Sequence, residues 1–321
     1  MGRYLTEPNY QKHPYLFAIA ENDIPNHYAV RKFGHNATVG ATEEDIWDGS
    51  AVYSYLTAAE TLQVSSDDVD DQGLLVSSGA VGEGSTSGYL YDNTANFLAD
   101  GVAVGDIVLD DCGCFGFVEA VDEKSITTSL ERPVFGLGQN YQVVNANDTG
   151  AAVVEIQGLD GDWAPQKEFV IMATGASVET VSSFLRIFRA RVIHAGSSLG
   201  NEGTISINDN ADVVNLAQII PEHAQTLMAL WTVPHGHTAY ITSFYAATSS
   251  SKEVEVDLFV RQYGSVFQVK KKISINQGTT RLPFDLPLPV LERSDITIRA
   301  SASGGGGDVS AGFDLWYELN D

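Results

Sequence analysis

Apolar and polar residues alternate repeatedly along this chain, and this alternation restricts the available folds more than any other feature. In "VEVDLFVRQYG", Val254, Val256, Leu258 and Val260 occupy every second position, while Glu255 and Asp257 lie between them. A period of two places successive side chains on opposite faces of an extended strand. "SDITIRAS" and "DVSAGFDLWYEL" repeat the pattern. The sequence therefore predicts half-buried strands over much of its length.

Segments with a helical period are rare, and the best short candidate is Tyr55–Leu62. Turn-forming residues separate the strand-like runs at spacings typical of a sandwich or barrel. We therefore predict an all-β chain that forms a jelly-roll-like β-sandwich. The polar borders "GEGSTSG" and "NANDTGA" enclose short strand patterns and indicate a small inserted β-barrel. The predicted organisation is 1–83, an amino-terminal β segment that completes the host domain, 84–147, the inserted barrel, and 148–321, the sandwich.

The charge balance excludes some classes of partner. The chain has 321 residues, with 42 acidic against 18 basic side chains and a formal net charge of -24. Nucleic acid and anionic membrane surfaces both need a basic face, so neither is expected as a partner. The beginning of the sequence has no apolar core behind a basic start, and no later run approaches ~18 apolar residues. We therefore expect neither a signal peptide nor a membrane span.

The sequence contains two cysteines, Cys112 and Cys114. Two thiols cannot build a disulfide framework or a four-cysteine zinc site. A local bridge is one reading, and two ordinary thiols beside a turn is the favoured one.

"VPHGHT" presents a His-x-His pair, His235 and His237. The pair suggests a metal, but Pro234 and Gly236 also fit a type I turn between the strands "TLMALWTV" and "TAYITSFYA". We favour a hairpin turn with structural histidines and predict no metal site there.

Two further motifs suggest enzymes. "GSSLG" places Ser198 in a Gly-x-Ser-x-Gly pattern, and "GAVGEG" (79–84) is glycine-rich. A nucleophile elbow needs a strand, a sharp turn and a helix, whereas Ser198 lies between two strand-like runs. A dinucleotide site likewise needs a following helix. We predict no catalytic residue and no cofactor, and therefore no enzyme.

Acidic and basic residues both gather locally. The clusters Asp67, Asp68, Asp70 and Asp71, and Asp160 with Asp162, either bind calcium or are solvated turns, and the second reading is favoured. Basic residues gather at Arg186, Arg189 and Arg191 and at Lys270–Lys272. Because the chain is so acidic, these groups could pair with an acidic neighbouring subunit or with their own surface. Lys271 interrupts an apolar phase, so we expect an edge strand, a bulge or a subunit contact there.

Longer stretches resemble a known group of proteins. "VVEIQGLDGDW", "SFLRIFRARVIHAGSSLGNEGTISI", "TLMALWTVPHGHTAYITSFYA" and "DVSAGFDLWYEL" are similar to a recurrent pattern in structural proteins of tailed bacteriophages, especially marine ones. "VRKFGHNATVGATEEDIWDGSAVYSYLTAAETLQVSSDDVDD" is similar to the opening of the same group. The resemblance covers most of the chain outside the insert. It implies a β architecture and carries no catalytic residues onto this sequence.

These observations favour a virion structural protein, most specifically a capsid decoration or cement protein on the outer surface of the head, assembled in the host cytoplasm. Its expected partners are the major capsid protein and copies of itself, with a trimer as the guess. The alternative is a tail-fibre or receptor-binding module that binds glycans through exposed aromatics such as Tyr89, Tyr91, Trp163 or Trp316. A polysaccharide-cleaving enzyme would need a carboxylate pair in a cleft, and no pair stands out.

Overall fold

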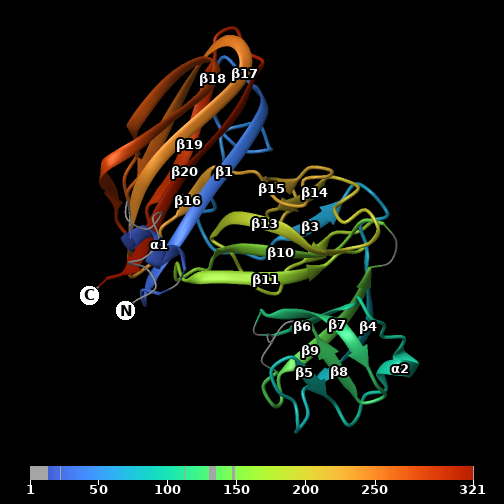
Figure 1. The fold of residues 1–321 in the computed structure, drawn as a ribbon. Coiled ribbons are helices and arrows are strands. Elements are labelled where there is room, and N and C mark those ends of the chain that lie inside the picture. The colour runs from blue at the N-terminus through green and yellow to red at the C-terminus, as the bar shows by residue number, and fades with distance from the viewer. Residues whose placement is uncertain (1–13, 22, 112, 130–134, 147–148, 321) are drawn as a thin grey trace. The chain divides into compact units, whose positions relative to one another are not determined.

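Strands dominate the computed structural model, which describes residues 14–21, 23–111, 113–129, 135–146 and 149–320 (Figure 1). The described helices are short, namely α1 (Pro14–Ala20) and α2 (Phe97–Asp100). Neither could cross a membrane. Asn96 begins α2 by accepting a hydrogen bond from Ala99 N, and Gly101 ends it at φ +91°. The chain is all-β, as the alternation predicts.

The chain divides into two compact units. The first, here called the jelly-roll unit, contains the residues up to Tyr53, Asp162–Ala164 and the residues from Leu227 onward. The second, here called the inserted unit, contains Ser54–Gly161 and Pro165–Thr226. Residues 148–226, which the sequence analysis grouped with the sandwich, therefore fall almost entirely in the inserted unit.

Two long strands build the jelly-roll unit by taking part in both of its sheets. The strands of this unit are β1 (His27–Val39), β2 (Glu44–Asp45), β16 (Leu230–Thr232), β17 (His237–Arg261), β18 (Phe267–Val290), β19 (Asp295–Ala302) and β20 (Gly307–Leu319). Residues 237–248 of β17 pair with β20, and residues 254–261 pair with β19. β18 follows β17 through both sheets. Figure 1 shows both strands as long ribbons.

The resulting strand order is that of a jelly roll. One sheet has the order β1, β20, first half of β17, second half of β18. The other has β2 and β16, then β19, the second half of β17 and the first half of β18. Counting β2 with β16 as one and the two long strands twice gives eight segments, in the orders 1-8-3-6 and 2-7-4-5. Two interleaved Greek keys of this kind define the jelly roll, so the predicted jelly-roll-like sandwich is confirmed.

The core of this unit lies between the two sheets. Val254, Val256 and Leu258 are fully buried, whereas Glu255 between them is exposed. Phe244 and Phe313 from the other sheet are also fully buried. The period of two read from the sequence therefore sorts side chains between core and solvent.

The inserted unit enters and leaves through one interrupted strand. β2 pairs with Arg299 and Ala300 of β19, and β16 continues along β19 from Thr297 to Asp295. At the break, Ile46 N donates to Ile298 O, and Ile298 N donates to Ala229 O. Ala229 N in turn donates to Ile46 O. β2 and β16, which are far apart in sequence, thus act together as one strand beside β19, and the break between them lies opposite Ile298.

The inserted unit holds two small sheets and a barrel-like module. Its first two sheets have the orders β11-β10-β13 and β12-β3-β14-β15. These strands are β3 (Gln63–Ser66), β10 (Ala151–Leu159), β11 (Pro165–Ile171), β12 (Val178–Glu179), β13 (Arg186–Ala195), β14 (Ile205–Asn208) and β15 (Asn215–Ile219). Every residue of β10 except Gln157 is buried.

The barrel-like module is a six-stranded sheet in the order β4-β9-β6-β7-β8-β5. Its strands are β4 (Gly73–Ala80), β5 (Tyr89–Tyr91), β6 (Ile107–Asp110), β7 (Phe115–Val121), β8 (Ser125–Thr128) and β9 (Asn140–Ala146). Gly82 N, just beyond β4, donates to Tyr91 O of β5, so the two ends of the sheet approach each other. The module begins at Gly73, in the range predicted for the amino-terminal segment.

Two local predictions are wrong. Tyr55–Leu62 is not a helix; Glu60 instead forms an isolated bridge with Phe184. The strands beside "VPHGHT" do not pair with each other, because β16 pairs with β19 and β17 with β18, β19 and β20. The turn is real, with Gly236 at φ +74°, but it joins strands of opposite sheets.

Candidate functional site

The two histidines of the His-x-His pair have separate local partners. His235 Nδ1 lies 2.5 Å from Glu292 Oε2, and His237 Nδ1 lies 2.8 Å from the carbonyl of His235. Gly236 N also donates to Glu292. That hydrogen bond, and the neighbouring His235, hold the pKa of Glu292 below its usual value. No cluster of three potential metal-binding side chains occurs among the described residues.

Ser198 lies in a loop between β13 and β14, not at a strand-to-helix turn. Its hydroxyl donates to Thr149 O at 2.5 Å and contacts Gly200 O at 3.2 Å. The hydroxyl therefore ties two loops together. "GAVGEG" is likewise followed by strand β5.

The acidic run Asp67–Asp71 organises loops of the inserted unit. Asp71 is fully buried and accepts hydrogen bonds from Ser66 Oγ, Ala151 N, Glu202 N and Gly203 N. The other carboxylates accept from Thr204 N on Asp67, Asp70 N on Asp68 and Thr149 Oγ1 on Asp70. A carboxylate that satisfies several backbone N–H groups is a structural acceptor. Asp160 and Asp162 are also engaged in interactions.

The basic residues grouped in the sequence lie in different environments in the structure. Arg186 is buried, donates to Leu56 O and lies over the Tyr55 ring. Arg189 and Arg191 remain side by side on β13. Lys271 is exposed on β18, which pairs with β17 at the edge of both sheets, and a bulge lies beside it. The expected edge position of Lys271 is confirmed. Cys114 is a free thiol, and Cys112 lies outside the described residues.

The aromatic side chains considered for glycan stacking differ in their accessibility. Trp316 stacks between Tyr240, at 4.2 Å between ring centroids, and His27, at 5.6 Å. Tyr15 also contacts Trp316 edge to face at 5.5 Å, so three aromatic rings pack against it. Trp163 contacts Tyr263 edge to face. Tyr89 is 37% exposed on the barrel-like module.

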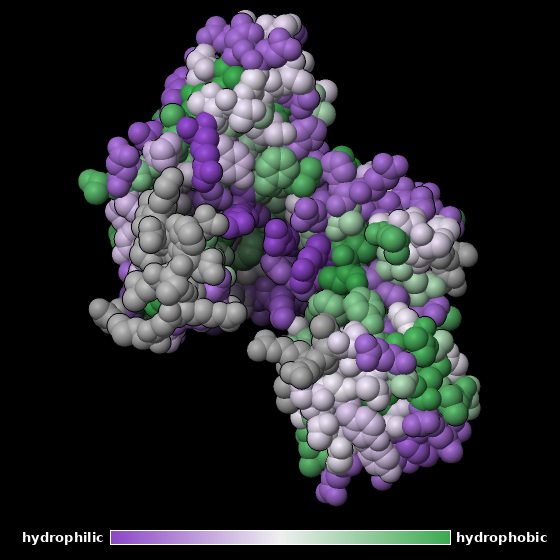
Figure 2. All heavy atoms as spheres, in the orientation of Figure 1, coloured by the Kyte–Doolittle hydropathy of each residue, from purple (hydrophilic) through white to green (hydrophobic). Residues whose placement is uncertain are grey.

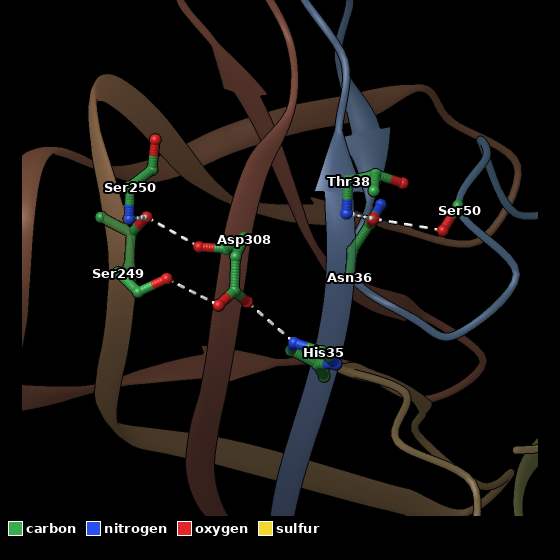
Figure 3. Close-up of polar contacts among 8 residues, drawn as sticks. His35, Asn36, Thr38, Ser50, Ser249, Ser250 and Asp308 are labelled. Atoms are coloured by element: carbon green, nitrogen blue, oxygen red, sulfur yellow. Dashed lines mark hydrogen bonds and ion pairs between the residues drawn. The ribbon is translucent and has the colours of Figure 1, made fainter. Parts of the chain in front are cut away.

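A polar cluster that the sequence analysis did not find lies where β17 passes between the sheets (Figure 3). Asp308 Oδ1 is 2.8 Å from His35 Nε2, and its Oδ2 accepts from Ser249 Oγ at 2.7 Å. These two hydrogen bonds lower the pKa of Asp308. The residue types are those of a hydrolase triad, but the carboxylate lies between the other two. A serine nucleophile needs the histidine as its neighbouring base, so this order does not fit a catalytic triad. The hydrogen bonds instead link β1, β20 and β17.

Asn36, next to His35, extends this polar cluster. It is fully buried; its Oδ1 accepts from Thr38 N and Ser50 Oγ, and its Nδ2 donates to Glu44 (Figure 3). The cluster therefore holds the corner of the sandwich. Its positions 35, 249 and 308 share no local motif, which is why sequence inspection missed them.

A groove of the jelly-roll unit lies between α1 and the outer face of the sheet that contains β1 and β20. Its volume is about 730 Å³, against about 370 Å³ for a pocket on the barrel-like module. Apolar side chains of α1 form one wall, including Leu16, Phe17 and Ile19. Volumes of this order are typical of ligand pockets.

Charged groups lie on the floor of the groove. Arg281 donates to Asp314 Oδ2 at 3.1 Å, and Arg31, opposite Asp314 on β1, is exposed. Tyr245 crosses the sheet and donates to Lys32 O at 3.2 Å. Gly312 permits this crossing, because a Cβ there would lie 2.3 Å from Tyr245 Oη. The groove thus combines apolar walls with two arginines and one carboxylate.

An apolar patch marks the barrel-like module. Leu74 and Leu75 on β4 and Leu98 on α2 are each close to half exposed or more. Figure 2 shows hydrophobic side chains gathered over this module around α2. Exposed apolar patches often mark contact surfaces.

Comparison with known proteins gives little. No family model matches the chain, and no curated protein matches it. One similar solved structure is described as "Structure of infectious bursal disease virus Gt strain", at 10% identity, with 96% of this chain and 81% of that chain covered and a TM-score of 0.16. A similarity at this TM-score carries no argument about fold or function.

Proposed function

We propose that this chain is a structural protein of a tailed-bacteriophage virion, where it decorates or cements the outer capsid surface. The observation that carries the proposal is the jelly-roll strand order of the unit that contains β17 and β18. Viral capsid domains use this double-sheet architecture repeatedly. The resemblance of most of the chain to phage structural proteins points to the same class.

The proposed role is non-enzymatic and depends on contacts with other subunits. The partners are the major capsid protein and further copies of this chain, in a symmetric assembly for which a trimer is the working number. Binding that occurs only on the assembled lattice stabilises that lattice by mass action. Exposed edge strand β18 and the apolar patch around α2 are surfaces of the kind such contacts use.

The test compares purified virions with and without the protein. Particles that lack it should release DNA at a lower temperature, and purified protein added back should restore the original temperature. Quantitative mass spectrometry and antibody labelling should place many copies on the head. Identical release temperatures, together with labelling confined to the tail, would contradict the capsid role.

A glycan-binding tail module is the second candidate, and the groove beneath α1 favours it. Jelly rolls also serve as lectin domains, and the groove joins apolar walls to Arg31, Arg281 and Asp314. Under this candidate, Arg31→Gln should weaken binding to host surface polysaccharide at least tenfold in calorimetry, with Lys271→Gln as the control. Tail-only labelling with saturable polysaccharide binding would favour it over the capsid role.

A further inference from the structure

Arg189 and Arg191 lie on one face of the sheet β11-β10-β13. Arg189 is directly opposite Gln157 on β10, which is in turn opposite Lys167 on β11. Two residues along, Arg191 is opposite Glu155. Directly opposed residues in a sheet share a face, so three cationic side chains gather on it. We name Lys167, Arg189 and Arg191 the basic face.

The one carboxylate among these opposed residues is already engaged. Glu155 is 2% exposed; its Oε2 lies 3.0 Å from Arg191 Nη2, and its Oε1 accepts from Gln157. No ion pair or hydrogen bond engages the Arg189 side chain among the described residues. Arg191 Nε is buried there with no hydrogen-bond partner. The Arg189 guanidinium therefore has unused donors, whereas Arg191 is partly engaged by Glu155.

The two arginines also disfavour each other. Burial, and next the charge of Arg191, lower the pKa of Arg189. An arginine stays protonated in proteins, so this unfavourable environment remains until an anion approaches. A guanidinium offers a planar pair of donors that matches a carboxylate.

We propose that the basic face binds carboxylates of an acidic segment from a second copy of this chain. The charge balance argues for this occupant, because the chain carries 42 acidic residues and only 18 basic ones. Any second copy therefore presents an excess of carboxylates, whereas the basic face is a rare complement to them. The proposal rests on the proposed function in one respect: it supplies a contact between copies in the assembly.

The experiment measures self-association of the full-length protein by sedimentation velocity in 150 mM salt. The central variant is Arg189→Gln, because Arg189 has no partner in the described chain and its loss leaves Glu155 paired with Arg191. We expect at least a tenfold weaker association, which is the effect of losing one charge-assisted bidentate contact. Thermal unfolding of the dilute variant should be unchanged or slightly higher, because arginine repulsion is relieved. Lys252→Gln, at an exposed lysine of the jelly-roll unit, is the matched control and should associate like the wild type.

Two further arms separate the guanidinium from simple charge and identify the ligand. Arg189→Lys keeps the charge but loses the planar donor pair, so it should restore only part of the affinity. Acetylated tetraglutamate should compete with self-association of the wild type. Inorganic phosphate at the same concentration should compete less well than the peptide.

The proposal is overturned if the wild type stays monomeric at 100 μM (about the concentration where weak contacts register), if Arg189→Gln associates normally, or if that variant melts markedly earlier. An early melt would show that Arg189 serves the fold. These outcomes are distinct from failure of the capsid role, which the DNA-release temperature of virions decides. A protein that cements particles but does not self-associate through Arg189 would retain the first proposal and lose this one.

Discussion

Asp257 is a buried carboxylate whose burial is only partly offset by neighbouring polar and charged groups. Asp257 is only 8% exposed, and its Oδ1 has no hydrogen-bond partner among the described residues. Lys272 Nζ lies 3.6 Å from its other oxygen. Burial nevertheless outweighs this cation and raises the pKa of Asp257. A raised folded-state pKa means that ionisation weakens the fold, so the contribution of this group is most favourable below about pH 4 and is lost as pH rises through the folded-state pKa.

Asp257→Asn should therefore raise the free energy of unfolding at pH 7, by about 1 kcal/mol or less. The gain should disappear at pH 3.5, where the wild-type carboxyl group is also largely protonated. Urea unfolding at the two pH values measures this difference. Glu255→Gln is the control, because Glu255 contacts the same Lys272 from a half-exposed position and should have little effect. A variant less stable than the wild type at pH 7 would show that the ion pair with Lys272 outweighs burial.

At the scale of elements, the barrel-like module shares a core with its host sheet. Ile107, Leu109 and Val144 of the module form one apolar cluster with Val153 and Ile171 of β10 and β11. The borders 84 and 147 read from the sequence would also separate β4 from β9, although these strands pair from Gly73 opposite Ala146 onward. The module is therefore attached more firmly than a flexible insert.

Excision of residues 74–145, with Gly73 and Ala146 joined through Asn-Gly, should leave a folded but weakened protein. Excision exposes the residues of the shared cluster that belong to β10 and β11, so the melting temperature should fall. Ile171→Thr in the shortened protein should recover solubility, because it removes part of this apolar surface. Excision of 85–147 should be worse, because it leaves β4 without its partner. Circular dichroism melts of both deletions measure the order. Equal stability of the two would contradict the pairing argument.

The alternation predicted strands correctly because it is local, whereas pairing is not. Val254, Val256, Leu258 and Val260 are buried as expected and Glu255 is exposed, but Asp257, expected on the exposed side, is buried. The turn at Pro234–Gly236 was also correct, but turn chemistry does not determine which strand the chain pairs with next. In a jelly roll, consecutive strands commonly lie in opposite sheets, so β16 and β17 do not form a hairpin. For the same reason, the sequence does not predict the contact of His35 with Asp308, because the two residues lie near opposite ends of the chain.

At the scale of the whole molecule, the jelly-roll unit buries side chains of both its sheets, and Asp162–Ala164 are the part of the intervening chain that belongs to it. Replacement of residues 54–226 by a short Gly/Ser linker should therefore give a soluble protein with one cooperative melt. The linker would join Tyr53 to Leu227, whose N–H donates to Asp48 of the same unit. The replacement also removes Trp163, which contacts Tyr263 and whose carbonyl accepts a hydrogen bond from His235 N, so some stability should be lost. Absence of a cooperative transition in calorimetry would show that the inserted unit is required for folding.

The strand break opposite Ile298 has a consequence for how such a gene can change. Because the two chain ends of the insertion meet at one strand position, the carrier strand keeps its register whatever length of sequence is placed between them. Longer intervening chains add little closure entropy. Genetic exchange can therefore replace the inserted unit as a whole while the region that contains β17 and β18 is inherited unchanged. The barrel-like module, which begins and ends at the paired residues Gly73 and Ala146, repeats this arrangement inside the first insertion, so the chain offers two nested sites for recombination.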